Sequence, residues 1–234
     1  MKPERAGGFE NLMSPRQSAL GWLYFPLHLL LLPVGLNIYV AWRAPDTSPV
    51  AINVAYLTVG ICFVLLVMLP FLRRGFDVMA ERPGRCLMSI LLAFCAVWLL
   101  SLAANLLLRG ILPATRTPND SYILELASAD RGAVTAINVF LAPLVEEVLF
   151  RGVAFGSIRP HSRFWAYAVS SLLFSLGHVW QYAAVARDAA LLIYGFRYMP
   201  AALALAWCYD RSGSIWAPIF FHMAFNGLSF RALS

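Results

Sequence analysis

The chain has 234 residues, of which 60% are hydrophobic and 13% are charged. Soluble globular domains are about half apolar and one quarter charged, so this composition excludes an ordinary soluble domain. The net charge is +6 and the mean hydropathy is +0.69, and the arginines lie mainly between apolar runs. Arginines in such places are typical of membrane topology and lipid-headgroup contacts, so we expect membrane lipids and no nucleic acid as partners.

Seven apolar runs follow one another along the chain, each long enough for a membrane helix. Their expected ranges are 20–42, 50–72, 86–108, 133–157, 164–186, 189–209 and 214–231. The sequence therefore predicts an all-α, polytopic transmembrane bundle of about seven to eight membrane helices. We expect one membrane domain over residues 1–234, with a polar N-terminal arm over 1–19.

Two further features concern the connections and the first run. The first run is too long for a signal-peptide core and is interpreted as a retained span. The longest connection, 109–132, contains two prolines and several acids, and is expected to be a loop or an interfacial segment. The four cysteines show no CxxC spacing and are expected to be small core residues.

Arginine and lysine in the connections predict the orientation. Ten of them belong to the N-terminal arm and to the connections after the second, fourth and sixth runs, and six belong to the opposite side. This bias predicts a multi-pass protein of the cell membrane with a cytoplasmic N-terminus.

The stretch VEEVLFRG places two carboxylates inside the fourth run. Glu146 and Glu147 are the only acids well inside a span, and an ionisable group there is by default a functional-site hypothesis. Arg151 lies one helical turn after Glu147 and can pair with it. Because consecutive residues point about 100° apart on a helix, we expect the two glutamates to have different roles.

Two later runs carry polar residues at helical spacing. FSLGH places Phe174 and His178 on one helix face, and HMAFN does the same for His222 and Asn226. Counting 1.5 Å per residue from the arginines at the neighbouring connections puts Glu146, His178 and His222 about 20, 22 and 17 Å deep. We therefore expect the three groups to meet at one level of the bundle.

Such a group of residues has the parts for attack of water on an amide. A buried carboxyl group can act as general base or acid, and histidine and asparagine can donate to an oxyanion. Glu146, His178 and His222 also form a plausible set of three zinc ligands with one open position. Direct base catalysis without a cofactor and water activation by one divalent metal, zinc first, both remain open.

At these residues the sequence resembles a known family. EEVLFR, FSLGH and HMAFN fit the patterns EExxxR, FxxxH and HxxxN, in that order, within residues 133–230. This resembles the CPBP (CAAX protease and bacteriocin-processing) or Abi family of intramembrane proteases, which includes the type II CAAX prenyl endopeptidases. The resemblance implies an intramembrane endopeptidase, described in this family both as a metalloprotease and as a metal-independent glutamate protease.

The resemblance also implies roles for the motif residues. Glu146 would activate water with help from His178, and His222 with Asn226 would stabilise the oxyanion. The remaining motif residues would support the site: Glu147, Arg151 and Phe174. The expected substrate is a peptide bond of a membrane-associated or lipidated protein.

Two residues outside the motifs complete the expectations. Arg197 lies in the sixth run at about the same depth, and we expect it to pair with a glutamate, to contact substrate or to tune the pKa of Glu146 or Glu147. His28 has no acidic neighbour in sequence and is expected to be structural.

Two other functions compete with a peptidase. A proton-coupled carrier would use the same groups as a relay, but seven spans without an internal repeat do not suit that plan. A non-catalytic immunity or regulatory protein of the same family is the second alternative.

Overall fold

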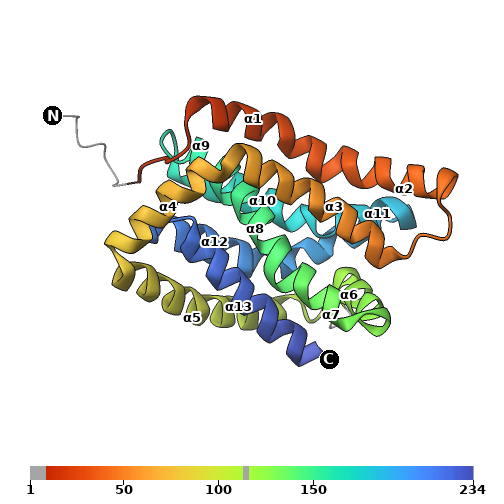
Figure 1. The fold of residues 1–234 in the computed structure, drawn as a ribbon. Coiled ribbons are helices and arrows are strands. Elements are labelled where there is room, and N and C mark those ends of the chain that lie inside the picture. The colour runs from red at the N-terminus through yellow and green to blue at the C-terminus, as the bar shows by residue number, and fades with distance from the viewer. Residues whose placement is uncertain (1–8, 113–115, 234) are drawn as a thin grey trace.

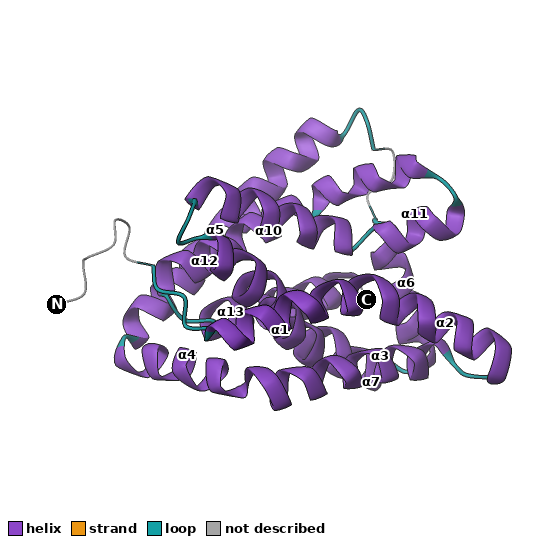
Figure 2. Cartoon of the chain, turned by 90° about the horizontal axis from the view of Figure 1, so that it is seen from above, coloured by secondary structure: helices purple, strands orange, loops and turns teal. Residues whose placement is uncertain are grey.

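The computed structural model describes residues 9–112 and 116–233, which form helices and short connections without a strand (Figures 1 and 2). The first two rods are continuous helices with a π-helical segment in the middle. They consist of α1 (Pro15–Pro26), η1 (Leu27–Leu31) and α2 (Leu32–Arg43), and of α3 (Pro49–Phe63), η2 (Val64–Met68) and α4 (Leu69–Glu81). The third rod is α5 (Pro83–Leu108).

The fourth rod carries the first motif. It is composed of α7 (Arg131–Thr135), η3 (Ala136–Leu141), α8 (Ala142–Glu147), η4 (Val148–Phe155) and α9 (Gly156–Ile158). Shorter helices surround it: α6 (Pro118–Ala129), α10 (Arg163–Gly177), α11 (Trp180–Ala186), the 3₁₀ helix η5 (Ala189–Arg197), α12 (Met199–Ser212) and α13 (Trp216–Leu233).

Four of these helices are long and apolar enough to cross a membrane. They are 15–43, 49–81, 83–108 and 131–158, and the bent pair η5 and α12 makes a fifth if it counts as one span. The predicted all-α polytopic bundle is thus confirmed, while the predicted number of seven spans is not. The difference arises in the second half of the chain. One predicted run divides there, another bends, and α13, which matches the predicted run 214–231, is not among the helices apolar enough to count.

The division of the later runs has local causes. The predicted run 164–186 breaks at His178, which ends α10, and α11 follows. The predicted run 189–209 bends by 48° between η5 and α12, where Pro200 stands at the start of α12. Proline lacks the N–H that a continuous helix would need, so the helix restarts there.

The long predicted connection contains a helix of its own. Thr117 begins α6 with a capping box, because its hydroxyl accepts from the Asp120 backbone N–H and the Asp120 carboxylate accepts from the Thr117 N–H. Of the two predicted alternatives for 109–132, a structureless loop is therefore wrong for residues 118–129.

Prolines explain three of the four π-helical segments. Each of η1, η2 and η3 ends two residues before a proline, and these prolines are Pro33, Pro70 and Pro143. A proline ring removes one donor and displaces the carbonyl four residues earlier. The wider π turn accommodates this change, and it leaves carbonyl groups without helical donors.

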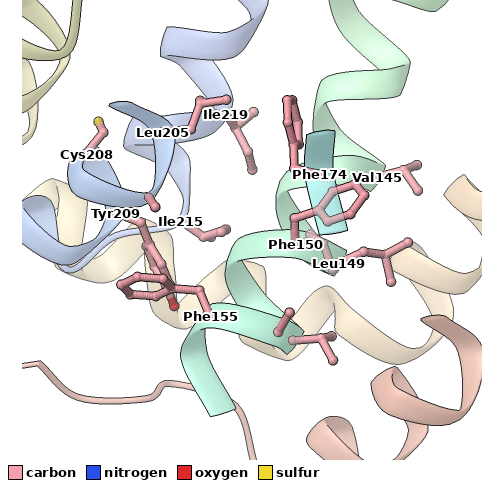
Figure 3. Packing of buried hydrophobic residues seen from close by; sticks show 14 of the residues in the cluster. Val145, Leu149, Phe150, Phe155, Phe174, Leu205, Cys208, Tyr209, Ile215 and Ile219 are labelled. Carbon is pink, nitrogen blue, oxygen red and sulfur yellow. The ribbon is translucent and has the colours of Figure 1, made fainter. Parts of the chain in front are cut away.

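The fourth π segment, η4, lies in the core. All eight of its residues are buried, and Figure 3 shows Leu149, Phe150 and Phe155 of this segment with the side chains around them. The first rod approaches η4 closely at Gly21, where an added Cβ would overlap Val153. This burial holds the first-motif helix rigidly among its neighbours.

The two ends of the bundle differ in charge. The start of α1, the α4–α5 and α9–α10 connections and the α12–α13 turn lie at one end (Figure 1). In the described residues this arginine-rich end carries Arg16, Arg73, Arg74, Arg82, Arg85, Arg159, Arg163 and Arg211. Lys2 and Arg5, which also supported the orientation, lie outside the described residues, as do residues 1–8 of the predicted arm. The prediction of an arm over 1–19 was wrong at its end, because residues 15–19 belong to α1.

The cysteines depart in part from the expectation. All four are free; Cys86 and Cys208 are buried as predicted, whereas Cys62 and Cys95 are exposed on the outer faces of their helices. The prediction that all four belong to the core was wrong for these two. A free cysteine behaves as a small apolar residue, so it is also compatible with a helix face that contacts lipid.

Candidate active site

The two glutamates at the end of α8 have different surroundings, as their helical spacing predicted. The Glu147 side chain is completely buried, whereas the Glu146 side chain is 26% exposed. Glu147 therefore belongs to the core and Glu146 to a cavity wall.

Glu146 lies between the two motif histidines. Its Oε2 atom is 3.9 Å from Nε2 of His178 and 3.9 Å from Nε2 of His222. These separations are too long for direct hydrogen bonds, and one water molecule can bridge groups at such spacing. The structure thus brings together the three groups that the depth count placed at one level.

Hydrogen bonds orient the His178 ring. Its Nδ1 atom lies 2.8 Å from the carbonyl oxygen of Phe174. A carbonyl oxygen only accepts, so Nδ1 carries the proton and Nε2 is the atom presented to Glu146. The rings of Phe174 and His178 are 4.5 Å apart, and those of Phe174 and His222 are 5.7 Å apart, so Phe174 packs against both histidines.

Glu147 holds the second histidine and an arginine. Its Oε1 atom lies 2.8 Å from His222 Nδ1 and accepts from Arg151 Nη1 at 3.1 Å. Arg151 also donates from Nη2 to the Ala202 carbonyl at 3.0 Å, and its guanidinium lies 4.3 Å from the centre of the Phe174 ring. One buried ion pair therefore joins the first-motif helix to α10, α12 and α13.

Asn226 is held by a carbonyl that the helix leaves free. Its Nδ2 atom donates to the Asn138 carbonyl at 2.9 Å. In η3 the Ala142 N–H bonds to the Ile137 carbonyl, and Pro143 has no N–H to offer Asn138. The missing proline donor is thus replaced by Asn226, whose second amide hydrogen stays available.

The turn before α13 sets the position of the last motif. Gly213 ends α12 with φ of 75°, a conformation that favours glycine. Ser214 Oγ then donates to the Gly75 carbonyl at 2.6 Å, and Trp216 Nε1 donates to the Leu72 carbonyl at 2.8 Å. These bonds fasten the start of α13 to α4, and the helix carries His222 from there to the site.

Two cavities meet at Glu146. The first cavity has about 170 Å³ and the second about 200 Å³. The second is lined by α6, α8, α10, α12 and α13, including His222 and Asn226. The first lies on the other side, toward α1 and α3. Both have Asn119, Asn138, Ala142, Glu146 and His178 in their walls.

Sequence reasoning missed Tyr198. Its ring stacks on His178 with centroids 4.6 Å apart and planes at 27°, and its hydroxyl lies 2.6 Å from Thr117 Oγ1. The sequence feature that could have indicated Tyr198 is its position between Gly195 and Pro200, because these two residues favour a helix break, and η5 and α12 do meet there. Asn138 was also missed, although it is a polar residue inside a predicted span.

Arg197 lies apart from the cavities. Its Nη1 atom donates to Asn105 Oδ1 of α5 at 3.0 Å, and Arg197 is in the lining of neither cavity. Its expected part in substrate contact or in tuning the glutamates stays a prediction. His28, by contrast, lines the first cavity together with Glu146, which the sequence did not indicate.

The arrangement of the site residues decides whether they can act together as metal ligands. Zinc ligand atoms lie about 2.0–2.2 Å from the ion in tetrahedral sites, so two ligand atoms of one ion are about 3.4 Å apart. The Oε2 atom of Glu146 is 3.9 Å from the Nε2 atom of each histidine, which is a longer separation. Within the described part of the chain, no group of three or more His, Cys, Asp or Glu side chains is placed to hold a metal ion. As arranged, the three residues do not fit a zinc ion, and no catalytic step is derived through one.

Comparisons with known proteins agree with the motifs. Residues 130–228 match the family model "Type II CAAX prenyl endopeptidase Rce1-like", and this segment contains all three motifs. A Bacillus subtilis (strain 168) protein named "Putative membrane peptidase YdiL" is 29% identical over 91 residues, which cover 38% of this chain. No solved structure matches. Over residues 130–228 the chain is therefore similar to type II CAAX prenyl endopeptidases, which supports the resemblance to the CPBP family that the motifs predicted.

The matches cover only part of each protein. The aligned segment spans 33% of the length of the Bacillus relative, so its activity as a whole does not transfer. The first three rods and α6 lie outside the matched segment.

Proposed function

We propose that the protein is an intramembrane endopeptidase of the cell membrane that hydrolyses a peptide bond of a membrane-associated or lipidated substrate. The observation that carries this proposal is the position of Glu146, which lies 3.9 Å from two histidine Nε2 atoms where two cavities meet. A water molecule there has a base beside it, and a peptide can extend into a cavity on either side.

The proposed reaction uses Glu146 as the base. Glu146 takes a proton from water while the water oxygen bonds to the carbonyl carbon, and His178 orients the water through Nε2. The same proton then passes from Glu146 to the amide nitrogen as the C–N bond breaks. This sequence needs a carboxylate that gains and then loses one proton, and Glu146 is the carboxylate that lines both cavities.

His222 and Asn226 are proposed to stabilise the oxyanion. The Nε2 side of the His222 ring faces the site, because Glu147 holds its Nδ1 at 2.8 Å. Asn226 can donate its second amide hydrogen while the first stays on Asn138. Arg151 keeps Glu147 in place and is a positioning residue.

The test compares the purified protein with Glu146→Gln on a pool of membrane-anchored and lipidated peptides, followed by mass spectrometry. Loss of a general base lowers the rate by roughly 10²–10⁴-fold, and we expect a loss of that size. Glu81→Gln, an exposed glutamate at the arginine-rich end, serves as the matched control and should retain activity. Cleavage that survives in Glu146→Gln, or a wild-type protein that cleaves nothing, would contradict the proposal.

The same assay addresses the cofactor. Activity that withstands prolonged chelation, with no metal found by elemental analysis of the active protein, is the expected result for direct base catalysis. Activity that chelation removes and zinc restores would assign the water activation to a metal instead.

A further inference from the structure

The half of the chain that carries no motif supplies one side of the first cavity. The first two rods contribute Phe25, His28, Leu29, Asn53, Tyr56 and Leu57 to its walls. Because Glu146 and His178 line the same cavity, anything bound in it lies beside the bond that the proposed function would hydrolyse. The cavity is therefore placed to select a residue of the substrate.

The walls of the first cavity separate by chemistry. An apolar wall is formed around Phe25 and Phe150, whose ring centroids are 5.3 Å apart, together with Leu29 and Leu149. The wall near α6 is polar but uncharged. There Asn53 Nδ2 donates to the Tyr122 hydroxyl at 2.9 Å.

A second bond extends the polar wall. The Tyr182 hydroxyl donates to Asn119 Oδ1 at 3.0 Å, and the rings of Tyr122 and Tyr182 meet edge to face at 6.2 Å. A hydroxyl that accepts one hydrogen bond keeps its own proton to donate, as Tyr122 does here. Among the described lining residues Glu146 is the only acid, and there is no lysine or arginine.

Size and polarity together specify the occupant. An apolar cavity of about 150 Å³ takes up benzene, so the 170 Å³ of the first cavity suits one aromatic ring. The polar wall suits a hydroxyl or amide at the far edge of that ring. A charged side chain would lie against neutral walls without a partner, apart from the glutamate that must act as base.

We propose, on the basis of the proposed function, that the first cavity is a specificity pocket for one uncharged, ring-sized substrate side chain next to the cleaved bond, with tyrosine preferred and phenylalanine accepted. Lysine, arginine, aspartate and glutamate are excluded at that position. The motif-free N-terminal half thereby selects the substrate for the motif-bearing half.

The test of specificity uses peptides with a randomised segment beside a membrane anchor, and the cleavage sites are read by mass spectrometry. We expect tyrosine and phenylalanine at one flanking position to be favoured over alanine and over charged residues by at least about tenfold. Equal cleavage with charged residues at both flanking positions would overturn the pocket.

Matched variants locate the preference. Leu29→Phe fills the first cavity and should remove the preference for aromatic side chains. Its control is Leu30→Phe, which alters the next residue; Leu30 is exposed and outside the lining, so the preference should stay intact.

A second pair of variants tests the polar wall. Asn53→Leu should remove the preference for tyrosine over phenylalanine. Thr58→Val on the same helix should not, because the Thr58 hydroxyl donates to a carbonyl of its own helix. Unchanged preferences in Leu29→Phe would contradict the assignment.

A binding experiment separates the pocket from the chemistry. ¹⁹F NMR of 4-fluorophenol with the Glu146→Gln protein in detergent should show bound ligand, which Leu29→Phe abolishes and Leu30→Phe retains. Binding with this pattern, combined with a wild-type protein that cleaves no peptide, would refute the proposed function and support the pocket. Cleavage without any Leu29-dependent binding or preference would refute the pocket and leave the function standing.

Discussion

At the scale of single residues, the site depends on one buried ion pair. Glu147 and Arg151 are both completely buried and 3.1 Å apart, and Glu147 also holds His222. An ion pair of this kind costs desolvation energy when it forms, yet removing one partner leaves a buried charge uncompensated. The pair thus makes folding and the position of His222 depend on each other.

A comparison of two arginines tests this dependence. Arg151→Leu should lower the free energy of unfolding by about 3–5 kcal/mol, because Glu147 then loses its cation in the core. Arg163→Leu should lower it by less than about 1 kcal/mol, because Arg163 pairs with Asp210 at 3.2 Å while 65% of its side chain is exposed. Reversible unfolding in detergent measures both, and equal losses would show that the buried pair has no special weight.

At the scale of helical elements, prolines decide where backbone groups become available. The π turn before Pro143 leaves the Asn138 carbonyl for Asn226, so a defect in one helix orients a side chain from another. The break before Pro200 similarly leaves Tyr198 stacked on His178. These irregular places are the ones that bring polar groups to Glu146.

A double-mutant cycle tests the link between Pro143 and Asn226. Asn226→Leu alone should cost about 1–3 kcal/mol of unfolding free energy, because the Asn138 carbonyl loses its partner. In the Pro143→Ala background the cost should be smaller, since the new N–H can donate to that carbonyl.

The matched control for this cycle is Pro70→Ala, a proline that follows η2 in the same way. Its combination with Asn226→Leu should be additive to within about 0.5 kcal/mol, because the two sites share no partner. If both cycles gave the same coupling free energy, the coupling would come from a general loss of helix packing and not from the Asn138 carbonyl.

At the scale of the whole molecule, the bundle has one arginine-rich end, and α6 lies at the other end (Figure 1). Both cavities are lined in part by residues of α6. Arginine is retained on the cytoplasmic side of membrane proteins, so the proposed orientation places the α9–α10 connection in the cytoplasm. The connection between α2 and α3 then lies outside.

Cysteine labelling tests this orientation. A membrane-impermeant maleimide applied to intact cells should label Asp46→Cys, in the α2–α3 connection, and should label His161→Cys only after permeabilisation. Both positions are exposed, and the unmodified chain with its four cysteines gives the background. Labelling of His161→Cys in intact cells, without Asp46→Cys, would invert the topology.

Much of the candidate site could be predicted because ionisable side chains are rare inside membrane spans. Carboxylates, histidines and an arginine are so costly in an apolar span that Glu146, Glu147, Arg151 and His178 stand out without any structure. The depth count from the arginines was sufficient to predict that three of the groups meet. Tyr198 and His28 were not predictable in this way, because tyrosine and isolated histidine are ordinary residues of helix interiors and interfaces.

The sequence by itself determined the apolar, membrane-suited composition, the all-helical class and the choice of residues that we propose carry the chemistry, because hydropathy and helical spacing are local properties. Tertiary structure alone decided how many rods are continuous, which carbonyl holds Asn226, and that the motif-free rods supply one wall of a cavity at Glu146. These features depend on contacts between residues as distant as Asn53 and Tyr122 or Asn138 and Asn226, and packing between helices has no signature in a single stretch of chain.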